Sequence, residues 1–276
     1  MSRDTPAWMP DWTALMQTAP EIALPAAEGD LYVIADAHLG DVRAPAQTFV
    51  DLLDTLPQPA GVVFMGDLFK VWLAIPKYWD VQVRSVLAAF RRLRERGVPV
   101  VFVVGNREYF LPTSPQRLAR SSLPFDHVIH GAGILHWAGR RYGLSHGDLV
   151  NRRDSQYLRW RRLSRSPWFE GLFRALPGGV ARRIAERLER ALADTNQQIK
   201  IQYPQDELEA FAATVLGNAA LGDLDGFLLG HFHRDETITV PGHRGSLRIV
   251  PDWFSHKTLL RMHPDGTSNL VELEAG

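Results

Sequence analysis

The stretch Leu31-Tyr-Val-Ile-Ala-Asp-Ala-His38 joins a short apolar run to two polar side chains, and the chain repeats this arrangement. It returns in Gly61-Val-Val-Phe-Met-Gly-Asp67 and in Val98-Pro-Val-Val-Phe-Val-Val-Gly-Asn106. Each run is continuous and rich in β-branched residues, which is typical of a strand buried on both faces. The sequence therefore predicts three buried strands, each followed closely by a polar side chain.

Helical patterns separate these runs. Apolar residues recur at steps of three and four between Tyr78 and Arg96, a second pattern covers Ala46 to Leu56, and Gly97 ends the longer helix. Alternating strands and helices predict a layered α/β fold whose first sheet is largely parallel. Further strands, taken to form a second sheet stacked on the first, are expected at residues 134–137, 141–145, 226–229, 237–240, 247–250 and 257–262.

The length of 276 residues and the apolar content of 45% fit one large layered domain. We expect a single domain over residues 1–276. It would carry a helical insertion at about 151–222 and a short N-terminal extension over residues 1–29.

Composition excludes several classes of protein. The 31 basic and 31 acidic side chains cancel, so no global field attracts nucleic acid, and a nucleic-acid partner is not expected. The absence of cysteine excludes disulfides and thiolate ligands. The first thirty residues do not resemble a secretory signal, and no apolar run approaches the roughly 20 residues that span a bilayer. We expect a cytoplasmic protein that can still contact a membrane at its surface.

Polar segments at the ends of the expected strands supply a set of metal-ligand side chains. In open α/β sheets, the loops beyond the carboxyl ends of the strands converge on one crevice. Carboxylate, amide and imidazole ligands suit manganese, iron or zinc. One carboxylate can bridge two ions about 3.5–4 Å apart, with a hydroxide between them that attacks phosphorus. The seven candidate ligands are Asp36, His38, Asp67, Asn106, His146, His231 and His233.

Each of these residues also has an ordinary structural interpretation. Asp36 could cap a helix, Asn106 could serve a turn, and His146 could be a hydrogen-bonded core histidine. The ordered set, with every member just after an apolar run, favours the metal site. Gly66 and Gly105 would then allow a close approach of the backbone.

Taken in order, the segments Asp36-Ala-His38, Gly66-Asp67, Gly105-Asn-Arg-Glu108, His146 and Gly230-His-Phe-His233 resemble the motifs of the calcineurin-like metallophosphoesterases. The resemblance implies a four-layer α/β-β/α sandwich of two mixed sheets with a helical cap insertion. It implies that one metal is held by Asp36, His38, Asp67 and His233. The other would be held by Asp67, Asn106, His146 and His231, with Asp67 bridging. Two divalent ions are implied, Mn²⁺ first, with Fe²⁺ or Zn²⁺ as alternatives.

One residue differs from the usual family motif and points to a particular subgroup of the family. Arg107 stands where the family usually has a catalytic histidine, as in the UDP-2,3-diacylglucosamine pyrophosphatases of bacterial lipid A synthesis. Those enzymes cleave a pyrophosphate to UMP and 2,3-diacylglucosamine 1-phosphate. An arginine can grip phosphate oxygens as negative charge builds up. The resemblance implies catalytic roles for Asp67, Asn106 and Arg107, and substrate contacts from Asn106, Arg107, Asp154, Gln197 and Lys200.

The insertion carries eleven arginines against four acidic residues between Asn151 and Arg190. Its apolar residues 169, 172, 173 and 176 fall on one helical face. A basic amphipathic cap would suit a lipid-linked nucleotide sugar or the inner face of the cytoplasmic membrane. The alternative is a helical hairpin whose apolar face packs on the core and whose arginines are solvated.

Other interpretations stay open. The segment Lys70-Val-Trp-Leu-Ala-Ile-Pro76 replaces an acidic motif of the lipid A enzymes, so the substrate could be another lipid head group, a nucleotide or nucleic acid. A non-catalytic scaffold is a third interpretation, against which the retention of all seven ligands argues. Glu108 is expected to orient the loop, and Asp148 to orient His146. Among the remaining histidines, His256 is the first to examine.

Overall fold

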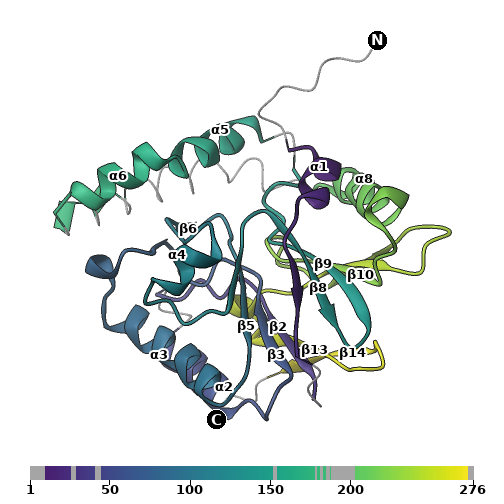
Figure 1. The fold of residues 1–276 in the computed structure, drawn as a ribbon, viewed down its shortest axis with the longest axis horizontal. Coiled ribbons are helices and arrows are strands. Elements are labelled where there is room, and N and C mark those ends of the chain that lie inside the picture. The colour runs from purple at the N-terminus through teal and green to yellow at the C-terminus, as the bar shows by residue number, and fades with distance from the viewer. Residues whose placement is uncertain are drawn as a thin grey trace.

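The computed structural model describes residues 10–25, 29–40, 45–151, 154–177, 179–180, 183–184, 187 and 203–272. Within these residues, two six-stranded sheets form the centre of the molecule (Figure 1). The first contains, in the order of hydrogen-bonded neighbours, β14 (Ser268–Glu272), β13 (Thr258–Met262), β2 (Leu31–Ile34), β3 (Gly61–Phe64), β5 (Val100–Val103) and β7 (His127–Ile129). The second contains β1 (Glu21–Ala23), β8 (Ala132–Trp137), β9 (Arg140–Ser145), β10 (Gly226–Leu229), β12 (Ser246–Ile249) and β11 (Glu236–Thr239).

Both sheets are mixed, as expected. Strands β2, β3, β5 and β7 run parallel, while β13 and β14 complete the first sheet in antiparallel pairings. The second sheet joins parallel neighbours β9, β10 and β12 to antiparallel pairs at β8 and β11. The expected strand at 257–262 was assigned to the wrong sheet, because β13 pairs with β2. An apolar run shows that a strand is buried, but not which neighbour it pairs with.

Side chains alternate between the two faces of each sheet. In β2, Leu31 and Val33 face the core between the sheets, whereas Tyr32 and Ile34 face the helices. On that outer side lie α2 (Ala46–Thr55) and α3 (Val81–Glu95). The outer face of the second sheet is covered by α1 (Trp12–Gln17) and α8 (Gln205–Leu216). The predicted four-layer sandwich is therefore confirmed.

Shorter elements connect these layers. Strands β4 (Trp72–Leu73) and β6 (Glu108–Tyr109) form a parallel two-stranded ribbon. The remaining short helices are η1 (Pro76–Tyr78), α4 (Pro115–Ala119), η2 (Ala219–Leu221) and α9 (Trp253–His256).

Helices α5 (Ser155–Ser164) and α6 (Pro167–Ala175) run in line across one end of the molecule (Figure 1). Phe169 and Phe173 of α6 are buried against Leu73 and Ile75. Leu172, on the same expected apolar face, is 41% exposed, so only part of that face packs on the core. The cap is thus attached to the core by two aromatic side chains.

Helix α8 lies within the segment expected to be an insertion, yet it packs on the second sheet beside α1. In the part of the chain that the structure describes, we find no helix with the length and apolar character needed to cross a bilayer.

Candidate metal centre

The seven candidate ligands follow strands of both sheets. Asp36 and His38 follow β2, Asp67 follows β3 and Asn106 follows β5, all in the first sheet. From the second sheet, His146 follows β9, and His231 and His233 follow β10. The carboxyl ends of strands in the two stacked sheets therefore supply side chains to one place.

Five of these residues adopt a left-handed backbone conformation, with φ of 48° at Asp36, 44° at His38, 55° at Asp67, 70° at His231 and 53° at His233. Such angles are uncommon for residues other than glycine, and each costs of order 1–3 kcal/mol. Hydrogen bonds between the loops hold this conformation, including Asp36 N–H to Gly66 O at 3.1 Å and His38 N–H to Asp67 O at 3.0 Å. Strain concentrated at ligand positions indicates a functional site.

One group of ligand atoms gathers around Asp36. The Nε2 atoms of His38 and His233 lie 3.3 Å apart. Nε2 of His233 lies 3.4 Å from Oδ1 of Asp36. These three side chains can offer ligand atoms that all lie within 4.8 Å of one another.

A second group surrounds Asn106. Its Oδ1 lies 2.9 Å from Nε2 of His146 and 3.0 Å from Nδ1 of His231. Nε2 of His146 lies 3.5 Å from Oδ1 of Asp67. Asp36, Asp67 and His146 form a second compact set of potential ligands, so the two groups share a carboxylate-rich boundary.

Glycines make this close approach possible. A Cβ atom at Gly66 would lie 2.7 Å from both Gly105 N and His146 Nδ1, and one at Gly230 would lie 2.8 Å from Asp36 Oδ2. Gly66 also has a φ of 93°. A larger residue at either position would push a ligand loop out of place.

Glu108 ties the loops together. Its carboxylate accepts hydrogen bonds from the backbone N–H groups of Asp67, Leu68 and Gly105, at 3.0, 2.8 and 2.8 Å. Burial and the adjacent Asp67 carboxylate raise the pKa of Glu108 to about 8, while the backbone donors oppose that rise. Glu108 thus orients the loops, in the role that its place in the sequence indicates.

His146 is oriented by a backbone group instead of by Asp148. Its Nδ1–H donates to the Met65 carbonyl at 2.7 Å. Asp148 instead accepts hydrogen bonds from Tyr157 Oη and from Arg161 Nε, the latter at 2.8 Å. The expectation for Asp148 was therefore wrong, because helix α5 supplies the hydrogen-bond donors to its carboxylate.

The electrostatics of the cluster fit a bound cation. With its Nδ1–H committed to Met65, His146 turns Nε2 toward the oxygens of Asn106 and Asp67, where a neutral imidazole has only a lone pair to offer. Burial alone would lower the pKa of His146, but Asp67, Asp36 and Asp148 raise it to about 9. Burial and His146 lower the pKa of His231 to about 4. The carboxylates thus favour one positive charge beside His146, and that charge disfavours a second one at His231.

Asp36 provides a second test of that fit. Burial by itself would raise its pKa, but the imidazoles of His233, His146 and His38 hold it well below the ordinary value. Its Oδ1 is buried and makes no hydrogen bond with any residue that the structure describes. A buried, ionised and unsatisfied oxygen beside imidazole nitrogens is what a metal ligand offers before the metal binds.

Arg107 approaches the cluster from the side of Asp67. Its Nε lies 3.9 Å from Asp67 Oδ2, and its side chain is 17% exposed. Its backbone N–H donates to Asp67 Oδ1 at 2.9 Å. The guanidinium group therefore stands beside the candidate bridging carboxylate.

The structure adds Asp252, which the sequence analysis missed. This buried residue caps α9, lies 3.9 Å from His233 Nδ1 and contacts His256 Nδ1 at 2.9 Å. His256 thus contacts Asp252, and it is in neither group of potential metal ligands among the described residues. The position of Asp252, just beyond β12, was the available signal.

Of the three remaining candidate substrate contacts, the structure describes only Asp154. Asp154 caps α5 by accepting a hydrogen bond from Tyr157 N–H at 2.9 Å. Gln197 and Lys200 lie outside the described residues.

Comparison with known proteins places this geometry in a family. The model of the calcineurin-like phosphoesterases matches residues 30–235, and the chain belongs to that family. It is a phosphoester-cleaving hydrolase by class. Among its curated relatives is the UDP-2,3-diacylglucosamine hydrolase of Xanthomonas axonopodis pv. citri, 29% identical over 85% of this chain and 96% of that protein. The protein of the same name from Xanthomonas campestris pv. campestris is 31% identical over 84% and 95%.

A solved structure of an archaeal phosphodiesterase covers 88% of this chain and 99% of its own, at 10% identity and a TM-score of 0.47. At that level of similarity it adds nothing to the assignment of function.

Proposed function

We propose that the cluster binds two divalent metal ions, Mn²⁺ in the first instance, with Fe²⁺ or Zn²⁺ as alternatives. Asp36, His38, Asp67 and His233 would hold one ion. Asp67, Asn106, His146 and His231 would hold the other. The mixed oxygen and nitrogen ligand set supports this proposal, as does the unsatisfied Oδ1 of Asp36.

We further propose that the protein hydrolyses the pyrophosphate bond of UDP-2,3-diacylglucosamine, giving UMP and 2,3-diacylglucosamine 1-phosphate. The observation that carries this proposal is the guanidinium group of Arg107 beside Asp67, within a cluster of metal-ligand side chains. The names of the curated relatives support the same substrate. Asn106, Arg107, Asp154, Gln197 and Lys200 are the proposed contacts to it.

The proposed roles follow from the chemistry of the side chains. Bound divalent ions would supply Lewis acidity and lower the pKa of water. Arg107 would neutralise charge that builds up on the phosphate oxygens, because its guanidinium stays protonated. Arginine is a poor proton donor, so the leaving group must depart with little protonation, as a phosphate does. Glu108 would keep the loops of Asp67 and Asn106 in register.

A second candidate is hydrolysis of another phosphodiester or phosphate monoester. The packing of the segment after Asp67 favours it. Leu73 and Ile75 lie against Phe169 and Phe173 of the cap, where the lipid A enzymes have an acidic motif. That difference changes the surroundings of the substrate and leaves the metal ligands unaltered.

We also propose that the protein is cytoplasmic and that its cap, formed by α5 and α6, contacts the inner face of the cytoplasmic membrane. Leu163, Trp168 and Leu172 are 49%, 70% and 41% exposed, and arginines accompany them on α5. Exposed apolar side chains with basic neighbours suit an anionic interface. Co-sedimentation with phosphatidylglycerol vesicles should fall when Trp168 is replaced by Ser, and unchanged sedimentation would count against this surface.

The test of the proposed function is product analysis. Purified protein with Mn²⁺ would be incubated with UDP-2,3-diacylglucosamine and, separately, with simple phosphodiesters. UMP from the first substrate alone is the expected result, and it should be lost in Asp67→Ala. Turnover of the simple phosphodiesters alone would favour the second candidate, and normal turnover by Asp67→Ala would refute the proposed metal centre.

A further inference from the structure

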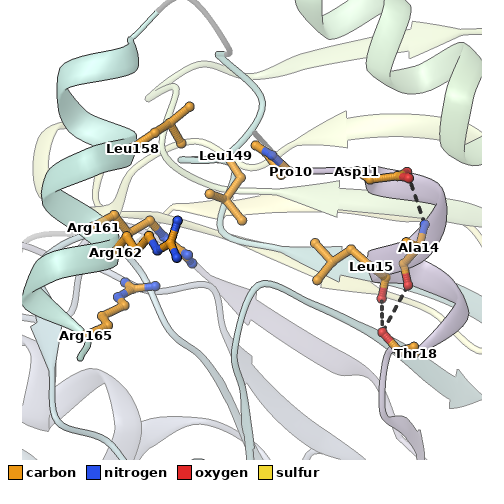
Figure 2. Close-up of a pocket in the computed structure, with 10 residues that line it drawn as sticks. All are labelled: Pro10, Asp11, Ala14, Leu15, Thr18, Leu149, Leu158, Arg161, Arg162 and Arg165. Atoms are coloured by element: carbon orange, nitrogen blue, oxygen red, sulfur yellow. Dashed lines mark hydrogen bonds between the residues drawn. The ribbon is translucent and has the colours of Figure 1, made fainter. Parts of the chain in front are cut away.

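A cavity of about 640 Å³ lies between α1 and α5 (Figure 2). It has the size of a small-molecule site. None of the seven candidate metal ligands lines it. Its walls are formed by Pro10, Asp11, Ala14, Leu15, Thr18, Leu149, Leu158, Arg161, Arg162 and Arg165.

One wall of the cavity is cationic. Figure 2 shows the side chains of Arg161, Arg162 and Arg165 gathered on the side formed by α5. Arg161 is neutralised by Asp148, at 2.8 Å, and Arg165 donates to the neutral carbonyl of Gly105. The side chain of Arg162, which is exposed, makes no hydrogen bond or ion pair within the described part of the chain. Asp148 attracts both Arg161 and Arg165, but only Arg161 is bonded to it, so Arg162 and Arg165 have no ion pair among the described residues.

The charge of Arg165 is unfavourable in this surrounding. Burial and the nearby Arg161 lower the pKa of Arg165. Burial also lowers the pKa of His130 to about 4, and Arg165 and Arg161 add to that fall. The carboxylate of Asp11, across the cavity, accepts hydrogen bonds from the backbone N–H groups of Thr13 and Ala14 at 3.0 and 3.2 Å. It caps α1 and does not contact the arginines through any hydrogen bond or ion pair that the described residues show.

The side of the cavity formed by α1 presents Ala14 and Leu15 together with the polar residues Asp11 and Thr18. Leu158 of α5 lies on the same side as the arginines, and Leu149 lies between the two helices. Helix α1 precedes residue 30, where the match to the family begins. The α1 side of the cavity is therefore built by a part of the chain outside the matched family region.

We propose that this cavity is a second binding site, which takes a phosphate monoester attached to an apolar body. Arg162 and Arg165 would contact the phosphate, since guanidinium forks match its oxygens in pairs. The apolar body would lie along Leu15, Leu149 and Leu158. The site is separate from the metal centre and does not depend on the substrate proposed above.

Arg162 is the residue to replace, because Arg165 also holds the backbone beside Asn106. Isothermal titration of the metal-loaded full chain with n-octyl phosphate should show two sites in the wild type, one at the metal centre and one in the cavity. Arg162→Glu should weaken the cavity site by roughly ten- to a hundredfold, the range expected for one charged hydrogen bond. Arg159→Glu, the same charge change on an exposed residue of α5 outside the cavity lining, should keep both sites.

Two further measurements test whether the cavity prefers a phosphate attached to an apolar body over free phosphate or a nucleotide. Inorganic phosphate and UMP should bind the cavity more weakly than octyl phosphate if Leu15, Leu149 and Leu158 contribute. Leu15→Ala should then weaken octyl phosphate and leave inorganic phosphate unchanged. Equal binding of octyl phosphate by wild type and Arg162→Glu would overturn the proposal, as would an equal loss in Arg159→Glu. Because turnover is not measured, these outcomes are independent of the proposed activity.

Discussion

Arg107 provides the sharpest test of chemistry at the scale of a single residue. Its Nε lies 3.9 Å from Asp67 Oδ2, so its charge is close to the reacting phosphate in the proposed function. Removing one such charge-stabilising group costs on the order of 10²–10³ in kcat. Arg107→Ala should therefore lose that much turnover in UMP release assays, while metal content measured by elemental analysis stays at the wild-type level. Arg107→Lys should recover part of the rate, and a loss of metal in Arg107→Ala would point to a structural role instead.

His130 should make the fold sensitive to acid. Its Nε2 lies 2.9 Å from the Pro112 carbonyl, and burial lowers its pKa from 6.5 to about 4. Between these values the unfolded chain binds more protons, so the free energy of unfolding falls as the pH drops through this window. The contribution is up to about 3 kcal/mol. Urea unfolding at several pH values should show that the free energy of unfolding falls less steeply with decreasing pH in His130→Gln than in the wild type. The same pH dependence in both proteins would show that His130 does not cause the acid sensitivity.

At this scale the sequence predicted candidate ligands that the structure brings together, and it indicated Glu108, but it missed other supporting contacts. Asp36, Asp67 and His146 follow apolar runs in a regular order, which made them recognisable. The contact of Arg165 with Gly105 joins residues 60 positions apart, so no local sequence pattern predicts it. The position of Asp252 just beyond β12 was a local signal, but its contact with His233 depends on tertiary structure.

At the scale of elements, Phe173 holds the cap to the core. Its side chain is 2% exposed in the cluster with Leu73 and Ile75, whereas the neighbouring Leu172 is 41% exposed. Truncating a buried phenylalanine costs about 3–5 kcal/mol. Phe173→Ala should therefore speed proteolytic cleavage between α5 and α6 and raise KM more than it lowers kcat. Leu172→Ala is the matched control and should behave as the wild type; equal sensitivity of the two variants would argue against this attachment.

The elements themselves were largely predictable. The apolar runs that begin at Leu31 and Gly61 and the expected strand at 226–229 coincide with β2, β3 and β10, because fully buried strands form continuous apolar runs. β7 and β14 were missed: most of their residues are exposed or only partly buried, which removes that signal. Partner choice was the second gap, since β13 joins the sheet of β2 through contacts between distant parts of the chain.

At the scale of the whole molecule, the candidate metal centre joins the two sheets. Asp36, Asp67 and Asn106 belong to loops of the first sheet, while His146, His231 and His233 belong to loops of the second. Across this boundary, Nε2 of His146 lies 3.5 Å from Asp67 Oδ1, and Nε2 of His233 lies 3.4 Å from Asp36 Oδ1. The sheets share an apolar core that holds them together independently of the loops.

Metal binding should therefore stabilise the folded protein without being required for folding. A ligand that binds only the folded state at 100 times its Kd adds about 2.7 kcal/mol. Calorimetry should show a higher Tm in Mn²⁺ than after treatment with EDTA, with secondary structure by circular dichroism unchanged at 25 °C. Asp67→Ala should lose most of this shift, because both proposed ions use its carboxylate, whereas Asp54→Ala, which removes an exposed carboxylate paired with Arg92, should keep it. An equal shift in Asp67→Ala would mean that the ions bind elsewhere.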